Sequence, residues 1–421
     1  MHRTDGSPVA LRSPWGQMAP AARQLILTRG LRSVAQGAMT VDFALYLKAL
    51  GWSGVGIGAL LTGGGLVGGL LGLVVGPLSD RSGRRPFLLF YQAMLVVASV
   101  VAVLTARGPV LAAAAVASSF GRGQGGGAGP FAPAEQAWLA AFVPARERGR
   151  VFSLNGAVSF WGMGVGSLLA GLVPLLAPVL PGALEYRPLF ALSALVAAAN
   201  LLQIRAIPEV RSSGDRPVRD PAVALRVRAA ENQAIWKLAL VNTVNALAIG
   251  LTGPLITYWF AIRFHVGPAA IGPVLGLTFL LTGFASVLTG RIAVNLGIVR
   301  SVVWVRLGGV ILLLMLPLMP TYALAALVYV LRSALNRGSV GARQALSVSL
   351  TGPERQGFAS SVNAASMRLP SSVGPMIAGY LFTAGALDVP FYAGALLQLL
   401  YVVLFHRVMG RYDPGGDRAA A

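Results

Sequence analysis

The chain alternates between long apolar stretches and short polar gaps along its whole length. Each apolar stretch runs for about 20 residues, which is the length that an α-helix needs to cross a bilayer. This pattern predicts an all-α integral membrane protein, because a helix satisfies its own backbone hydrogen bonds in lipid. About twelve transmembrane helices are predicted, near residues 30–49, 54–77, 86–106, 110–141, 151–176, 187–205, 235–261, 268–290, 300–319, 321–349, 358–383 and 389–408.

The polar gaps differ in charge from one gap to the next. Arginines gather in the gaps at 81–85 and 146–150 and in the long stretch 205–233, whereas the intervening gaps hold few basic residues. Positively charged loops tend to stay in the cytoplasm. We therefore expect a multi-pass protein of the cell (inner, cytoplasmic) membrane with both termini in the cytoplasm.

One polar connection is much longer than the others, and it divides the predicted spans into two groups of six. The predicted segments are a cytoplasmic tail over 1–24, a six-helix half over 25–206, a cytoplasmic linker over 207–233, a second six-helix half over 234–409 and a cytoplasmic tail over 410–421.

The two halves also repeat each other in sequence. A shift of 208 residues places Gln136 on Gln344, Asn155 on Asn363, Gly166 on Gly374 and Gly171 on Gly379. Duplicated six-helix halves are typical of secondary transporters, which bind substrate near the middle of the membrane between the halves. The fold prediction is therefore two six-helix pseudo-repeats.

Composition narrows the function. The mean hydropathy is +0.70 and the net charge is +20, but the arginines lie in short gaps and form no basic domain, so nucleic acid is not an expected partner. There is no cysteine and no catalytic triad or metal-binding cluster is visible. We expect neither an enzyme nor a cofactor.

The connection after the second predicted span reads GPLSDRSGRR, residues 76–85. It resembles the loop signature of the major facilitator superfamily, and the two six-span repeats extend the resemblance over almost the whole chain. The resemblance implies a conformational latch, in which an aspartate caps a helix of the opposite half and arginines brace it in the outward-facing state. The latch residues are Gly76, Asp80, Arg81, Gly83, Arg84 and Arg85.

The latch has an ordinary alternative, since Arg84 and Arg85 could also be solvated cytoplasmic arginines. In the second half Val294 stands where the aspartate would be, so a symmetric second latch is not expected. A second resemblance lies in the fifth span, where the glycines and Ser167 of 162–171 are similar to the antiporter signature of the superfamily. This resemblance implies export, and close helix packing is the alternative reading of the same small residues.

Charges inside spans are costly in lipid and therefore point to function. Asp42 and Glu135 are the acidic residues that fall well within predicted spans. Asp42 is predicted to carry the coupled proton, with Arg122 as its partner; a static ion pair between the two is the alternative. Arg122 lies in a short stretch that resembles an arginine motif of the family's fourth span. Glu135 is interpreted as a structural partner of the loop arginines and is the next candidate for the proton site.

The resemblance implies that spans one, four, seven and ten line a central substrate cavity. The predicted cavity residues are Gln36, Gln136, Asn242, Asn245, Trp259, Arg332 and Asn336. The second-half spans contribute arginines and no acidic residue, which favours a substrate with a carboxylate or phosphate over an organic cation. Snorkelling arginines are the alternative interpretation.

These observations predict a secondary active transporter that moves a small molecule by alternating access. Proton-coupled export by a monomer is the leading interpretation, with the substrate, protons and the lipid bilayer as partners. The alternatives are a proton symporter or facilitator for uptake of a small organic anion, and a membrane sensor that does not transport.

Overall fold

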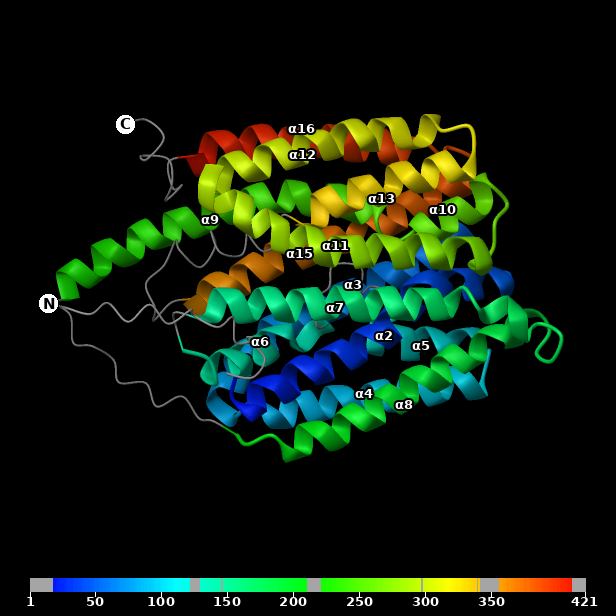
Figure 1. Cartoon of the computed structure of the whole chain (residues 1–421), viewed down its shortest axis with the longest axis horizontal. Helices are drawn as coiled ribbons and strands as arrows, with labels where there is room; N and C mark the ends of the chain where they lie inside the picture. The colour runs from blue at the N-terminus through cyan, green and yellow to red at the C-terminus, as the bar shows by residue number, and fades with distance from the viewer. Residues whose placement is uncertain are drawn as a thin grey trace, which may run out of the picture.

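The computed structural model describes residues 18–121, 129–144, 147–209, 221–296, 298–338, 340 and 356–410. Within helices, a few side chains at one end of the molecule, including those of Asp80 and Arg81, are not described. The described chain is helical with short connections, as the apolar pattern predicts. Helix α2 begins and helix α16 ends at the same end of the bundle, on the left of Figure 1. We call this the terminal end and the opposite one the distal end.

The first half runs from α2 to α8. Its elements are α2 (Pro20–Ala49), α3 (Gly54–Ser82), α4 (Arg85–Leu104), α5 (Gly108–Ser118), η2 (Gly129–Phe131), α6 (Ala132–Ala141), α7 (Arg148–Ala170), η4 (Val173–Leu176), η5 (Gly182–Tyr186) and α8 (Arg187–Ala206). The second half runs from α9 to α16. Its elements are α9 (Pro221–Thr252), α10 (Ile256–Arg263), α11 (Pro268–Leu296), α12 (Ile298–Met315), η6 (Leu316–Leu318), α13 (Tyr322–Gly338), α15 (Gln356–Thr383) and α16 (Val389–Met409).

Two predicted spans are broken rather than continuous. The predicted helix over 110–141 stops at Ser118, where Ser119 takes a left-handed backbone with φ 57°, and resumes as α6. The predicted helix over 235–261 is interrupted between α9 and α10, where Pro254 lacks the N–H that a continuous helix needs. Helix α9 begins at Pro221, inside the predicted linker.

Counting α5 with α6 and α9 with α10 gives twelve spans over the described chain, as predicted. Eight segments of the described chain are long and apolar enough to cross a membrane by length and composition alone. The remaining four spans are either too polar or too short to meet these limits of length and composition. Helices α2 and α15 carry arginines, serines and other polar residues, α13 is described over 17 residues, and α5 and α6 are short.

The repeat seen in the sequence corresponds to equivalent helix crossings. In the first half α7 packs against α2, and in the second half α15 packs against α9. A side chain at Gly166 would run into the Val34 carbonyl oxygen of α2, and one at Gly374 would run into the Gly250 backbone of α9. The sequence shift that relates Gly166 to Gly374 therefore marks two equivalent sites where backbones touch.

The two halves meet along α3 with α15 and along α7 with α11. A Cβ at Gly54 would lie 2.9 Å from the Gly379 carbonyl oxygen, and a Cβ at Gly272 would lie 2.5 Å from the Gly171 Cα. The Met376 N–H also donates a 3.2 Å hydrogen bond to the Thr62 hydroxyl. The halves are thus in direct backbone contact toward the distal end, through small residues on both sides.

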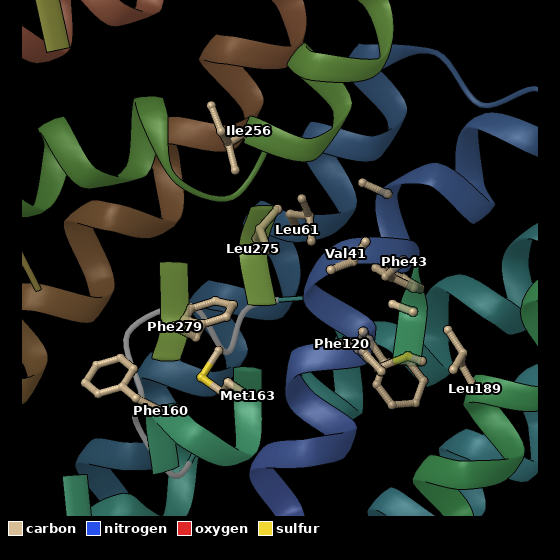
Figure 2. Packing of buried hydrophobic residues seen from close by; sticks show 14 of the residues in the cluster. Val41, Phe43, Leu61, Phe120, Phe160, Met163, Leu189, Ile256, Leu275 and Phe279 are labelled. Carbon is tan, nitrogen blue, oxygen red and sulfur yellow. The ribbon is translucent and has the colours of Figure 1, made fainter. Parts of the chain in front are cut away.

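A single apolar cluster crosses this boundary. Val41 and Leu61 of the first half lie in the same cluster as Ile256, Leu275 and Phe279 of the second half. Figure 2 shows these residues converging from α2, α3, α10 and α11. Apolar packing and close glycine contacts therefore join the halves, while the polar groups described next lie inside them or at their margin.

Candidate functional site

A buried ion-pair cluster lies in the first half between α2 and α6. The Arg32 guanidinium donates a 2.5 Å hydrogen bond to Glu135, and the Arg29 Nη1 lies 3.6 Å from the other carboxylate oxygen. All three residues are at most 5% exposed. Two buried guanidinium groups thus share one carboxylate, which is the arrangement that makes buried charges tolerable.

The break in the fourth span explains why Glu135 lies at this site. Because the helix resumes at Ala132, Glu135 falls in the first turn of α6, near the positive end of the helix dipole. At the same break Gly129 has φ 66° and leaves no space for a Cβ beside the Tyr91 hydroxyl. The interpretation of Glu135 as a partner of the loop arginines is therefore wrong: among the described residues its partners are Arg29 and Arg32 of α2.

Asp42 lies further along α2 and is 1% exposed. Neither of its carboxylate oxygens has a hydrogen-bond partner among the described residues. The predicted partner Arg122 lies outside the described residues. Ten residues separate Asp42 from Arg32, about 15 Å along a helix, so the two acidic sites are distinct. Gln36, which is predicted to line the cavity, lies between them, and its Oε1 is buried with no hydrogen-bond partner in the part of the chain that the structure describes.

The described polar groups of the second half form hydrogen bonds between its own helices. Asn242 donates a 2.7 Å bond to Asn363 of α15. The Asn245 oxygen accepts from Arg306 of α12 at 3.1 Å, and Arg306 also lies 5.5 Å from the Tyr401 ring. These contacts tie α9 to α12 and α15.

Arg332 and Asn336 also face helices of their own half. Arg332 donates a 3.3 Å hydrogen bond to Thr252 of α9, and Asn336 donates a 3.4 Å bond to Gln398 of α16. A Cβ at Gly309 of α12 would run into the Asn336 side chain. The structure therefore packs both residues between α9, α12, α13 and α16, and their role in a cavity stays a prediction.

Trp259 and Gln136 are placed differently from each other. Trp259 is fully buried on α10, donates a 3.0 Å hydrogen bond to the Leu387 carbonyl and packs 4.6 Å from the Phe391 ring. This aromatic cluster lies at the distal end. Gln136 is half-buried on α6, next to Glu135 in the chain. Of the predicted cavity residues, Gln36 and Gln136 lie on the two helices that carry the ion-pair cluster.

The predicted latch loop has a partner that the sequence analysis missed. The backbone N–H groups of Arg84 and Arg85 donate to the two Glu209 carboxylate oxygens at 2.8 and 2.9 Å, so Glu209 caps the start of α4. Gly83 is needed there because its φ is 95°, and a Cβ would lie 3.3 Å from Glu209.

The arginines of this loop also bind within the first half. The Arg84 side chain donates a 2.9 Å bond to the Ala137 carbonyl, and the Arg85 side chain donates to the Arg205 carbonyl. The side chains of Asp80 and Arg81, and the surroundings of Gly76, lie outside the described set. Glu209 is the first acidic residue of the basic stretch after the sixth span, and its position there is the signal that could have pointed to it.

Twelve spans in two pseudo-repeat halves, with buried charge inside a membrane-spanning bundle, define a polytopic transport protein rather than an enzyme. The sequence profile of the Major Facilitator Superfamily matches residues 25–335 and, a second time, residues 238–420. The chain belongs to the Major Facilitator Superfamily, as the loop signature predicts.

Solved structures of transporters share the fold. A bacterial homolog of the human lysosomal transporter Spinster, in an inward-facing and unoccupied conformation, is 17% identical, with 93% of this chain and 95% of that chain covered and a TM-score of 0.64. The human organic anion transporter MFSD10 is 18% identical, with 92% and 100% covered and a TM-score of 0.65. A D-xylose-proton symporter is 14% identical, with 91% and 96% covered and a TM-score of 0.67.

Proposed function

We propose that the chain is a monomeric, secondary active transporter that exports a small molecule in exchange for protons by alternating access. The observation that supports this proposal is the contact between the halves. Glycines at 54, 58, 171 and 272 bring backbones together across α3–α15 and α7–α11. A boundary made of small residues lets two rigid halves rock against each other with little side-chain rearrangement.

The topology is part of the same proposal. The two six-helix halves span 25–206 and 234–409, the linker 207–233 and both tails lie in the cytoplasm, and the membrane is the cell membrane. The distal end then faces outward. Under this orientation, the backbone contacts of Gly54 and Gly272 close the outward side in the present conformation.

Asp42 is the proposed proton site. A buried carboxylate that accepts no hydrogen bond is costly when charged, and protonation removes most of that cost. Asp42 meets this description in the present conformation. We propose that it is protonated here and releases the proton in another conformation, in which it meets water or Arg122.

The small residues of α7 support export. The Ser167 hydroxyl donates a 3.2 Å hydrogen bond to the Gly37 carbonyl, and a Cβ at Gly162 would run into the Gly30 carbonyl. The stretch that resembles the antiporter signature is thus the stretch that brings α7 closest to α2. We further propose that the loop of Asp80 to Arg85 is the latch, with Glu209 holding its arginine-rich end.

A flux experiment in proteoliposomes tests this function. Pyranine inside the vesicles reports pH while ethidium, as a cationic probe, and paired anionic and neutral compounds are added outside. Export by antiport predicts that a gradient of at least one compound moves protons in the opposite direction. Protons that move with the compound would support uptake by symport instead.

A cross-link tests whether the flux needs the halves to move. The chain has no cysteine, so Thr62→Cys with Met376→Cys can be joined across the boundary by a short bifunctional methanethiosulfonate, which forms a disulfide with each thiol and releases methanesulfinate. We expect this cross-link to stop the flux and reduction to restore it. Ser33→Cys with Ser159→Cys is the matched control, because these hydroxyls lie 2.8 Å apart within one half. Unchanged flux in the cross-linked Thr62/Met376 variant would contradict alternating access.

A further inference from the structure

Arg368 lies at the boundary between the halves, at the midpoint of α15. It lines a small recess together with Gly69 and Gly72 of α3 and Ser361 of α15. A Cβ at Gly69 would lie 3.9 Å from the Arg368 Cβ, so α3 approaches this arginine closely. Arg368 is therefore a charged residue of the second half placed directly against the first half.

Arg368 is half-buried, and its guanidinium differs from those of Arg29 and Arg32. Arg29 and Arg32 are held by Glu135, whereas the Arg368 guanidinium makes no hydrogen bond or ion pair with the described residues. It lies close enough to Tyr91 and Arg29 of the first half to interact with them electrostatically.

The described side chains around the boundary therefore bring together three guanidinium groups and one carboxylate. Arg29 and Arg32 already share the carboxylate, and Arg368 approaches them from the opposite half. Like charges in a poorly solvated region repel, and a charge buried without a counter-ion is costly. A ligand that carries a negative charge would remove both costs.

We propose that Arg368 binds the anionic group of the transported substrate, a carboxylate, phosphate or sulfonate, between the two halves. This inference rests on the proposed transport function and names the substrate class. The guanidinium offers two parallel N–H donors, which match two oxygens of such a group. The positive field of the Arg29–Arg32–Glu135 cluster supports the anion from the first half.

The same geometry gives the anion a role in the transport cycle. An anion bound to Arg368 screens the repulsion between Arg368 and Arg29 and so favours closure of the halves around it. Release of the anion restores the repulsion. Binding on one side of a moving boundary thereby shifts the equilibrium between conformations, as a ligand must if it prefers one of them.

Thermal unfolding of the full-length protein in detergent tests this proposal. The probes are three pairs of an anion and its uncharged counterpart: benzoate and benzamide, glucose 6-phosphate and glucose, and benzenesulfonate and benzenesulfonamide. Chloride keeps the ionic strength constant. We expect at least one anion to raise Tm in a saturable way while its neutral partner does not.

Variants of Arg368 then show whether the anion that raises Tm binds at this residue. Arg368→Gln is expected to weaken the apparent affinity for that anion by about 30-fold or more, because a desolvated charge pair is lost. Arg368→Lys should keep part of the affinity, since a point charge remains but the two-donor fork is lost. Arg300→Gln is the matched control, because Arg300 is exposed at the start of α12.

Two results would overturn the inference: no anion stabilises the protein more than its neutral partner, or Arg368→Gln binds anions as wild type does. Circular dichroism and a ligand-free Tm no lower than that of the wild type show that the variant is folded; if it is not, Arg368→Lys carries the comparison. The proposed transport function fails by a different result, the absence of compound-driven flux and of any cross-link effect. If a neutral compound drives flux while no anion has an effect, the transport function stands and Arg368 is not an anion site.

Discussion

The first half buries carboxylates, whereas the second half buries arginines among amides and hydroxyls. Asp42 and Glu135 lie in the core of the first half. Helices α10 to α13, α15 and α16 contain no acidic residue in their sequence. In the second half Arg306 and Arg332 instead bind Asn245 and Thr252. Among the described residues, the fully buried acidic side chains therefore belong to one half.

The two halves differ in their buried charges, but they share the positions at which backbones touch. Gly166 and Gly374 occupy equivalent crossings, and Gly171 and Gly379 both touch the opposite half near the distal end. Duplication has thus kept the positions where two backbones must meet and has not kept the charges. The buried carboxylates thus lie in the first half, whereas the buried charges described in the second half are arginines, which keep their protons.

The largest loss of stability is expected when the carboxylate that neutralises Arg29 and Arg32 is removed. Glu135→Gln leaves Arg29 and Arg32 buried without a counter-ion, and we expect a loss of about 3–5 kcal/mol in the free energy of unfolding. Asn242→Ala in the second half removes a neutral hydrogen bond to Asn363 and should cost about 1 kcal/mol. Denaturation in detergent, followed by circular dichroism, compares the two.

A rescue experiment separates the charge from the packing. Replacing the whole cluster, with Arg29→Met, Arg32→Met and Glu135→Leu, should restore most of the stability, because an apolar core needs no counter-ion. Equal losses for Glu135→Gln and Asn242→Ala would remove the contrast between the halves.

The span order could be predicted from the sequence because each apolar stretch is long and repeated. The break in the fourth span could not be predicted from apolar character alone, although Pro130 and Pro133 were visible there. The partners of Glu135 depend on that break, which sets where α6 begins. The sequence predicts that Arg332 and Asn336 line the cavity, but it does not tell which neighbouring helices they contact.

Substitutions at the two equivalent glycine crossings test the structural repeat that the halves share. Gly166→Ala and Gly374→Ala each force a methyl group into the backbone of the neighbouring helix, and overpacking of this kind costs about 1–3 kcal/mol. The two losses should be similar, because the crossings are equivalent. Gly156→Ala of α7 is the control: no atom lies within 4 Å of its Cβ, so a gain of about 0.5–1 kcal/mol is expected. A loss in only one half would mean that the repeat is not structural.

The smallest change in stability, with the largest change in function, is expected for Asp42→Asn. Asparagine has nearly the same shape and no charge, and Asp42 forms no hydrogen bond with the described residues that the change could remove. The unfolding free energy should therefore change little. If Asp42 carries the proton, the variant loses accumulation driven by a pH gradient but still exchanges substrate across the membrane.

Asp388→Asn provides the matched control for this experiment. Asp388 precedes α16 at the distal end, and asparagine is accepted as well as aspartate at a helix N-cap. This variant should keep gradient-driven accumulation. A static ion pair between Asp42 and Arg122 predicts a different outcome, because Asp42→Asn would then lower stability and leave the pH dependence of transport unchanged. In that case Glu135 becomes the candidate proton site, since it is the other carboxylate in the core of the first half.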